Sequence, residues 1–459
     1  MTALIMAAGA GTRMRSSLPK VAHSVCGRPM IAWSVAAARA SGSERIVAIV
    51  SPDRDLGRWL PEGVETVVQP TADGTGGALR AALPVISESE SVLVLSGDQP
   101  LVSAAEIGAL VEESTRDDAA AVILTAELDD PGSYGRVVRG EDGSVDRIVE
   151  AKEPGDATEE ELAIREVNAG TYLFDSAALA AALDQISNDN AQGEYYLPDV
   201  IPAIRQAGGS IAAVVTDSVS VGVNDRTELA AVEAEARRAL LTEHMRAGVT
   251  VADPDSTWID VDVKIAEDVR IEPGCSLRGS SEIEAGAVIG PHSTLIDSRV
   301  GEGSEVVSSH LDSCSVGAQV RVGPFAHIRP GTELADGSKA GSFVEIKNSR
   351  IGKGAKVPHL SYVGDAEVGD ESNLGASTIT ANYDGKDKHR TKIGRKVRTG
   401  VDTTLVAPVE VGDEAYTGAG SVITEDVPAG ALGIGRPEQH NVEGYSDRKQ
   451  EANEDEEAK

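Results

Sequence analysis

Apolar positions follow one pattern in the first half of the chain and a different one in the second. Up to about residue 225, short continuous apolar runs alternate with stretches that predict helices, such as 29–40 and 104–113. Such runs are typical of strands buried on both faces, and the alternation favours an α/β, Rossmann-like domain with a mostly parallel sheet. The clearest of these runs are 47–50, 92–95 and 121–124.

A connecting helix is expected over 227–247, after a first domain of residues 1–226. The segment holds no Gly or Pro, is rich in Ala, Glu, Leu and Arg, and gives way to Gly248. One apolar stripe along it is expected to face a core. Its members are Leu229, Val232, Ala236, Leu240 and Met245.

From about residue 250, aliphatic side chains recur every six positions. A helix cannot sustain this period, because positions six apart lie on different faces. A coil of three short strands can, since it places one aliphatic side chain inward on each strand. The period therefore predicts a left-handed parallel β-helix of hexapeptide repeats over 248–445. Its first run is Ile265, Ile271, Leu277, Ile283, Ile289 and Leu295, and later runs resume at Val300, Val316, Ile351 and Leu405.

Two segments break the six-residue pattern. Residues 382–391 (NYDGKDKHRT) are rich in charge and hold no aliphatic residue, so we expect a loop extruded from the β-helix. Residues 446–459 are acidic and lack any period, so we expect a disordered tail.

Charge and composition exclude several classes. The 42 basic and 74 acidic residues give a formal net charge of −32, which repels phosphate backbones, so we expect neither nucleic acid nor an anionic membrane as a partner. No apolar run approaches the roughly 20 residues of a membrane span. Three widely spaced cysteines, Cys26, Cys275 and Cys314, form neither a disulfide framework nor a C-x-x-C metal site, so we expect a cytoplasmic location.

A glycine-rich segment, AAGAGTRM at 7–14, follows the first apolar run directly. Such a loop exposes backbone N–H groups that can cradle phosphates. It lacks the third Gly of a dinucleotide fingerprint and the Gly-Lys-Ser/Thr of a Walker loop. Arg13 and Lys20 add positive charge where an acidic protein must hold a triphosphate.

This string is similar to that of sugar-1-phosphate nucleotidyltransferases. With the β-helix behind it, the chain resembles the bifunctional N-acetylglucosamine-1-phosphate uridyltransferase / glucosamine-1-phosphate N-acetyltransferase family over nearly all of residues 1–440. The resemblance implies acetyl-CoA-dependent N-acetylation of glucosamine 1-phosphate by the second domain. It further implies Mg²⁺-dependent uridylyl transfer from UTP by the first, giving pyrophosphate and UDP-N-acetylglucosamine for peptidoglycan and other envelope polysaccharides.

The resemblance also implies a nucleotide site in the first domain. Asp98 ends an apolar run, and ligands of open α/β sheets gather at that edge; with Asn224 it is expected to hold Mg²⁺. Many relatives carry Tyr where Ser96 stands. The implied nucleotide contacts are Met6, Ala7, Ala8, Gly9, Lys20, Gln69, Gly74, Thr75, Ser96, Gly97 and Asp98, and the implied sugar contacts are Gly135, Glu150 and Asn168.

Uridylyl transfer needs no general base, because a sugar 1-phosphate is already an anionic nucleophile. The expected task is alignment and neutralisation of charge, which we assign to Mg²⁺, Arg13, Lys20 and the loop amides.

In the second domain, the resemblance implies an acetyltransferase site. His359 is expected to be the general base that takes a proton from the 2-amino group, and Asn382 could orient that step or the developing oxyanion. Arg329, Lys347, Tyr362 and Asn373 are expected to bind glucosamine 1-phosphate. The implied acetyl-CoA contacts are Ala376, Asn382, Tyr383, Lys388, Val401 (where Ser is common), Ala419 and Arg436.

Three alternatives remain open on the sequence: a glucose-1-phosphate adenylyltransferase with a structural β-helix, a zinc-dependent β-helix hydratase, and a non-enzymatic scaffold. The adenylyltransferase leaves His359 and Asn382 without a role, and the hydratase needs more closely spaced histidines. A homotrimer is expected, because the flat faces of a triangular prism can pack about a threefold axis. The resemblance further implies that acetyl-CoA lies between subunits.

Overall fold

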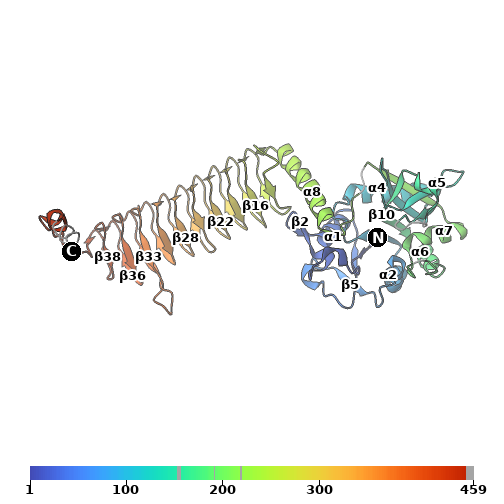
Figure 1. Ribbon diagram of the computed structural model, residues 1–459, viewed down its shortest axis with the longest axis horizontal. Helices are drawn as coiled ribbons and strands as arrows, with labels where there is room; N and C mark the ends of the chain where they lie inside the picture. The colour runs from blue at the N-terminus through green and yellow to red at the C-terminus, as the bar shows by residue number, and fades with distance from the viewer. Residues whose placement is uncertain (152–156, 191, 218–219, 451–459) are drawn as a thin grey trace, which may run out of the picture. The chain divides into compact units, whose positions relative to one another are not determined.

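A computed structural model describes residues 1–151, 157–190, 192–217 and 220–450 (Figure 1). The chain divides into two compact units, Met1–Leu240 and Leu241–Lys459. Lys152, beside the expected sugar contact Glu150, and the tail residues 451–459 lie outside the described part. Residues 445–450, at the start of the segment expected to be disordered, form an exposed helical turn. None of the helices in the described ranges is long and apolar enough to cross a membrane.

The first unit is built on a sheet with the strand order β11-β7-β10-β6-β1-β4-β5. Its neighbouring strands run parallel except at β10, which is antiparallel to both β6 and β7. The hairpin β8 (Arg136–Arg139) and β9 (Val145–Val149) joins β10, and β2 (Ser24–Val25) pairs with β3 (Arg28–Pro29). The other strands are β1 Thr2–Met6, β4 Arg45–Val50, β5 Glu65–Val68, β6 Ser91–Ser96, β7 Ala121–Glu127, β10 Glu166–Asp175 and β11 Ile211–Thr216.

Helices cover both faces of this sheet. Successive strand residues point to opposite faces, so Leu4 joins one apolar core and Ile5 the other, which explains the continuous apolar runs. The predicted α/β class is therefore confirmed. The helices are α1 Met30–Ala40, α2 Thr75–Ala81, α3 Leu83–Ser87, α4 Ala104–Asp117, α5 Glu159–Leu162, α6 Ser176–Leu183 and α7 Val200–Gln206; short 3-10 turns are η1 Thr12–Met14, η2 Lys20–Ala22, η3 Gly57–Trp59 and η4 Leu197–Asp199.

The long helix α8 spans Arg226–Arg246. Val232 and Ala236 are buried against Met14 and Met30 in the first unit. The predicted stripe is wrong at its end, because Met245 is 39% exposed. Leu241 takes over as the buried side chain and belongs to the core of the second unit.

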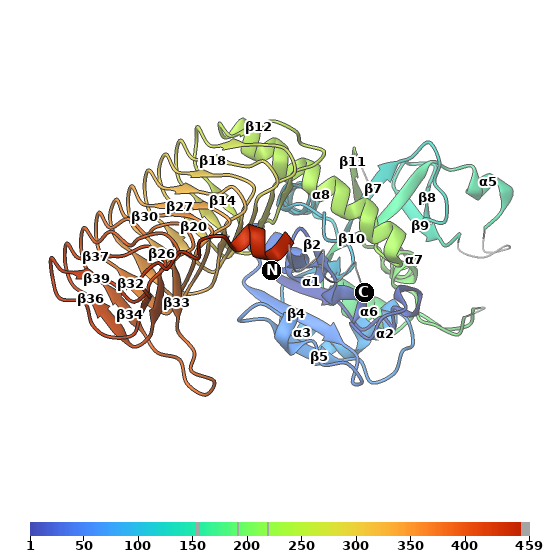
Figure 2. The ribbon, with the colours of Figure 1, turned by 60° about the vertical axis from the view of Figure 1, so that its left-hand side comes forward.

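The second unit is a prism of short parallel strands, with its coils stacked as Figure 2 shows. The predicted β-helix is confirmed: most strands bury one aliphatic side chain along the axis of the prism. Ile265 near the first coil is only partly buried, and threonines, Thr380 and Thr417, take the buried position in β33 and β37. Most strands pair in register with the equivalent strand of the next coil, as Ile328 does with Ile346 and Ile346 with Val363.

The coils form three sheets. The first holds β12 Thr250–Val251, β15 Arg270–Ile271, β18 Val288–Ile289, β21 Glu305–Val306, β24 Arg321–Val322, β27 Lys339–Ser342 and β30 Lys356–His359, with β37 Tyr416–Thr417 and β39 Leu432–Gly433 further along. The second holds β13 Trp258–Ile259, β16 Ser276–Arg278, β19 Thr294–Ile296, β22 His310–Asp312, β25 His327–Ile328, β28 Glu345–Lys347, β31 Tyr362–Gly364, β33 Ile379–Ala381, β35 Thr404–Val406 and β38 Val422–Ile423. The third holds β14 Lys264–Ile265, β17 Glu282–Ile283, β20 Arg299–Val300, β23 Ser315–Val316, β26 Glu333–Leu334, β29 Arg350–Ile351, β32 Ala366–Val368, β34 Thr391–Ile393 and β36 Val409–Val411.

One loop leaves the prism between β33 and β34, where the sequence predicts it (Figure 1). Its two limbs pair at Tyr383 and Lys388. The coils on either side keep their register, because Ala366 pairs directly with Thr391 and Thr391 with Val409. We call residues 382–391 the corner loop.

Candidate active sites

A cavity of about 360 Å³ opens at the carboxyl ends of the parallel strands β1, β5 and β6. Every expected nucleotide contact lines it except Gly97, whose backbone N–H instead donates to the Met6 carbonyl at 2.9 Å. The cavity therefore lies at the sheet edge where ligands of open α/β folds bind. Its lining is Met6, Ala7, Ala8, Gly9, Ala10, Lys20, Val21, Gln69, Ala72, Gly74, Thr75, Ala78, Ser96, Asp98 and Glu194.

The glycine-rich loop is fitted closely to Lys20. Gly11 has a φ of 59°, and a Cβ there would lie 2.7 Å from the Lys20 Cβ. Gly9, by contrast, has nothing within 4 Å of a Cβ position, so its backbone faces open space. Gly11 thus lets the loop approach Lys20, and Gly9 leaves the loop accessible to a ligand.

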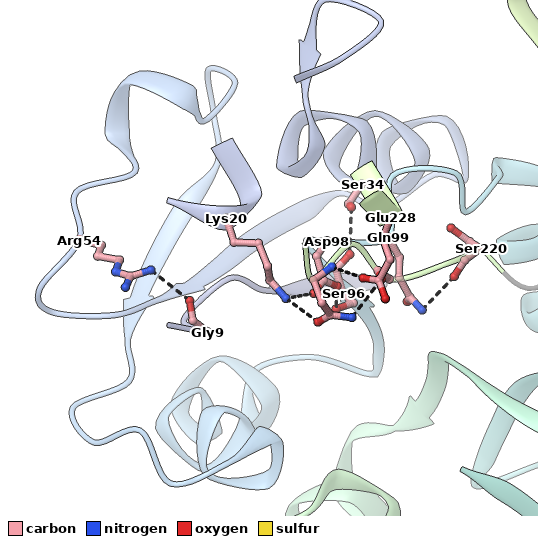
Figure 3. A network of polar contacts seen from close by, with 11 residues as sticks. Gly9, Lys20, Ser34, Arg54, Ser96, Asp98, Gln99, Ser220 and Glu228 are labelled. Atoms are coloured by element: carbon pink, nitrogen blue, oxygen red, sulfur yellow. Dashed lines mark hydrogen bonds and ion pairs between the residues drawn. The ribbon is translucent and has the colours of Figure 1, made fainter. Parts of the chain in front are cut away.

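The basic side chains near this loop differ in exposure. Arg13 is exposed on η1 and does not line the cavity. Arg54, which the sequence analysis missed, donates from Nη1 to the Gly9 carbonyl at 3.4 Å (Figure 3). No local signal in the sequence links position 54 to position 9, because the two are joined only by the parallel pairing of β1 with β4.

Lys20, Asp98 and Asn224 meet at one point. The Lys20 ammonium forms an ion pair with one Asp98 carboxylate oxygen and lies 3.4 Å from the Asn224 Oδ1. The other Asp98 oxygen accepts a hydrogen bond from the Ser96 hydroxyl at 2.6 Å. Figure 3 shows Lys20 in contact with Asp98. Their side chains are only 13% and 17% exposed, so the pair is partly shielded from water.

This donor set fits a hard cation. The Asp98 carboxylate and the Asn224 amide oxygen both point at a positive charge, here the Lys20 ammonium, and such oxygens are the ligands that Mg²⁺ prefers. Asn224 is held by its own backbone N–H, which donates to Glu228 at 2.6 Å, and by its side-chain amide, which donates to the Gly222 carbonyl at 3.1 Å. Across the described ranges, His, Cys, Asp and Glu nowhere gather in a metal-binding group of three or more. A metal here would take its other ligands from substrate and water.

A second cavity of about 270 Å³ contains all three expected sugar contacts. Asn168 is fixed by donation to the Tyr172 hydroxyl at 2.6 Å and by accepting from the Gly170 N–H at 3.0 Å. Burial raises the pKa of Tyr172, which keeps its hydroxyl neutral. The lining is Gln99, Ser133, Tyr134, Gly135, Glu150, Asn168, Val221, Gly222, Asn224 and Glu228, so Asn224 links this cavity to the charged cluster.

Most of the expected amino-sugar contacts lie on the second sheet of the β-helix. Lys347 ends β28 and Tyr362 begins β31 on the next coil. Arg329 follows β25 and donates to Glu345 at 2.7 Å. His359 ends β30 on the first sheet, one residue before the corner that leads into β31. Asn373 belongs to the first sheet through its bridges to Lys356 and Arg398.

The expected acetyl-CoA contacts follow further along the prism. Asn382 is buried, whereas Tyr383 is 60% and Val401 54% exposed. Ala376 and Val401 accept backbone hydrogen bonds from Asp402 and Gly420 of the next coils. Ala419 and Arg436 are exposed near the last coil. Asn382, Tyr383 and Lys388 therefore belong to the corner loop, whereas the other expected acetyl-CoA contacts lie elsewhere in the second unit.

The corner loop brings Lys388 beside Lys347. The neighbouring Lys347 ammonium lowers the pKa of Lys388, so the two positive charges lie close together. The positive charges of both lysines also help to lower the pKa of a buried carboxylate that the sequence analysis missed, that of Asp365. An anion would be attracted to this pair of ammonium groups.

Both units resemble known proteins. Residues 3–197 match the family of MobA-like NTP transferase domains, and residues 262–297 match the bacterial transferase hexapeptide family (six repeats). Proteins called "Bifunctional protein GlmU" are similar to nearly the whole chain. That of Pseudarthrobacter chlorophenolicus is 48% identical over 452 residues, 96% of this chain and 91% of the relative. That of Mycolicibacterium vanbaalenii is 46% identical over 458 residues, 97% and 92%. That of Kineococcus radiotolerans is 48% identical over 451 residues, 96% and 91%.

Proposed function

The chain belongs to the GlmU family of bifunctional proteins, and from that premise we propose which residues carry each of its two reactions. The family expected from the sequence is confirmed. The protein is a bifunctional enzyme: it acetylates glucosamine 1-phosphate and then transfers a uridylyl group to N-acetylglucosamine 1-phosphate. We assign uridylyl transfer to residues 1–226, acetyl transfer to 248–445, and a connecting role to 227–247.

Uridylyl transfer is assigned to the two cavities of the first unit. UTP would occupy the larger cavity with its phosphates on the glycine-rich loop, and N-acetylglucosamine 1-phosphate the smaller. Asp98 and Asn224 would hold Mg²⁺, which when bound neutralises and aligns the phosphates. Lys20, released from Asp98, would then contact the triphosphate. The observation that supports this best is the convergence of Asp98 and Asn224 on one positive charge beside the cavity.

Acetyl transfer is assigned to the second unit. Lys347 and Lys388 provide positive charge for phosphate groups, and Tyr362 lies on the adjoining coil. His359 is exposed on its strand end, where its imidazole can accept the proton of the attacking 2-amino group. The amine then attacks the thioester carbonyl of acetyl-CoA, and coenzyme A leaves as the thiol.

Chelation should separate the two reactions. We expect EDTA to abolish formation of UDP-N-acetylglucosamine from UTP and N-acetylglucosamine 1-phosphate, and added Mg²⁺ to restore it. Acetylation of glucosamine 1-phosphate should be unchanged, because aminolysis of a thioester has no pair of anions to bridge. Both products can be measured by chromatography of one reaction series. If chelation abolished both activities equally, the assignment of the metal to Asp98 and Asn224 would be wrong. Activity only with ATP and glucose 1-phosphate would favour the adenylyltransferase alternative.

A homotrimer is proposed as the active assembly. Phe325 and Phe343 are two of the chain's three phenylalanines, yet they are 60% and 58% exposed. Their rings stack with centroids 5.2 Å apart, and Leu360, 59% exposed, stands at the equivalent corner of the next coil, beside His359. Exposed apolar side chains in a row mark an interaction surface. Their place beside His359 favours a second copy of this chain as the partner.

Light scattering is expected to give three times the 47.6 kDa chain mass. The double variant Phe325→Ser, Phe343→Ser should dissociate towards the monomer and lose acetyl transfer while keeping uridylyl transfer, because its substitutions lie only in the second unit. An active monomeric acetyltransferase would contradict the trimer.

A further inference from the structure

Asp365 is a buried acid in the corner between β31 and β32. It is 6% exposed, and both carboxylate oxygens are used: Oδ1 accepts from Asn348 Nδ2 at 2.6 Å, and Oδ2 accepts from Asn382 Nδ2. Burial acts to raise its pKa, but these hydrogen bonds and the ammonium groups of Lys347 and Lys388 outweigh it, so the pKa is lowered. Asp365 is thus held as a carboxylate among groups of the acetyltransferase site.

The contact with Asp365 settles which way the Asn382 side chain faces. A carboxylate can only accept hydrogen bonds, so the Asn382 amide must turn its NH₂ group towards Asp365. Its carbonyl oxygen is then directed away from the carboxylate. Since Asn382 is itself only 7% exposed, the pairing holds the side chain in this one orientation.

Asp365 also holds both ends of the corner loop. Its side chain binds Asn382 at the start of the loop, and its backbone carbonyl accepts from the Thr391 N–H at the end, at 3.2 Å. Its own N–H donates to the Lys347 carbonyl at 3.0 Å. One residue therefore connects the base of the loop that carries Lys388 to the strand that ends in Lys347.

We propose that Asp365 is a positioning residue for acetyl transfer, which fixes the corner loop so that Lys388 stands beside Lys347 and Asn382 presents its carbonyl oxygen to acetyl-CoA. This inference rests on the proposed function of the second unit. Asp365 touches no reacting atom in this scheme; it acts through Asn382 and Lys388.

The variant Asp365→Asn tests this with little change of shape. Asn tolerates the same left-handed backbone, where Asp365 has a φ of 51°, but its single oxygen can accept from only one of the two asparagines. Asn382 can then meet the new NH₂ group only by turning its own carbonyl oxygen towards position 365, in an uncharged and weaker hydrogen bond. We expect the KM for acetyl-CoA to rise roughly 10-fold, the size of losing one hydrogen bond to a charged group. The kcat and the KM for glucosamine 1-phosphate should stay within about twofold, as should uridylyl transfer.

Asp297→Asn is the matched control. Asp297 stands at the equivalent corner of an earlier coil with a φ of 45°, and it too accepts a hydrogen bond, from the Ser280 N–H at 2.9 Å. Asp297→Asn should leave the kcat and KM of both reactions unchanged. If wild type fails to acetylate glucosamine 1-phosphate, the proposed function is wrong; if wild type acetylates it and Asp365→Asn has the wild-type KM for acetyl-CoA, only the inference is wrong.

The rate of tryptic cleavage reports on the conformation of the corner loop independently of catalysis. Lys386, Lys388 and Arg390 are exposed in the loop, and cleavage after them should be faster in Asp365→Asn than in wild type or Asp297→Asn. The exchange variant Asp365→Asn, Asn382→Asp can re-form the contact in reverse, because the amide introduced at position 365 can donate to the carboxylate introduced at position 382 and still accept from Asn348. It should restore protection of the loop. Unchanged cleavage in Asp365→Asn, or an exchange variant cleaved as fast as the single one, would overturn the proposal.

Discussion

We expect Asp98→Asn to lower uridylyl transfer roughly 10³-fold, the scale on which losing one preorganised electrostatic group affects catalysis. The substitution keeps the size of the side chain and its contact with Ser96 but removes the negative charge that the Lys20 ammonium and a metal ion require. The rate should be measured as pyrophosphate release at saturating UTP and Mg²⁺. Acetyl transfer should stay at the wild-type rate, because the second unit has its own core.

Asp130→Asn, at an exposed aspartate away from both cavities, is the control for this substitution. Asp130 accepts a hydrogen bond from the Gly132 N–H at 3.2 Å in an exposed turn, and neither residue lines the two cavities. Asp130→Asn should therefore keep both activities. If Asp98→Asn retained more than a tenth of the wild-type uridylyl transfer, the metal would have to be placed on other residues.

His359→Ala should have the opposite effect, lowering acetyl transfer by about 10² to 10⁴, the usual contribution of a general base. Without the imidazole, the 2-amino group must lose its proton to solvent. The remaining rate should therefore rise with pH more steeply than the wild-type rate. Thiol release from acetyl-CoA measures it directly, and uridylyl transfer in the same preparation reports that the protein is folded.

His292→Ala is the matched control for a histidine of the same prism. His292 occupies a corner on an earlier coil, where its ring lies against Gly274. Its loss should leave acetyl transfer unchanged. Were His359→Ala to lose both activities while remaining folded, the second site would have to be reassigned.

The fold could be predicted where the sequence repeats a physical constraint. A buried aliphatic residue every six positions has few solutions other than a β-helix, and the ladder from Ile271 onwards is buried as expected. The antiparallel direction of β10 could not be predicted in this way. A strand buried on both faces is apolar whichever direction it runs, so Tyr172 and Phe174 pack in the core as residues of a parallel strand would.

In the candidate sites, too, contacts within one sequence motif could be predicted, whereas contacts between distant positions could not. Residues within one motif, such as Met6 to Gly9, line the cavity together, because consecutive positions remain neighbours after folding. Arg54 beside Gly9 and Asp365 beside Asn382 are contacts between distant positions, and no local pattern signals them. Arg13 belongs to the same glycine-rich segment but is exposed and is not among the residues that line the cavity, so its role in uridylyl transfer stays a prediction.

The corner loop bears on how new chemistry enters a repetitive scaffold. Each coil must return in register, so a residue inserted within a strand would turn every later side chain to the wrong face. An insertion at a corner escapes this rule, because the direct pairing of Ala366 with Thr391 closes the coil whatever lies between. Lengthening such a loop costs only a slowly growing closure entropy. The prism can thus gain a functional side chain such as Lys388 from a segment that is free to vary, while the scaffold beneath it stays fixed.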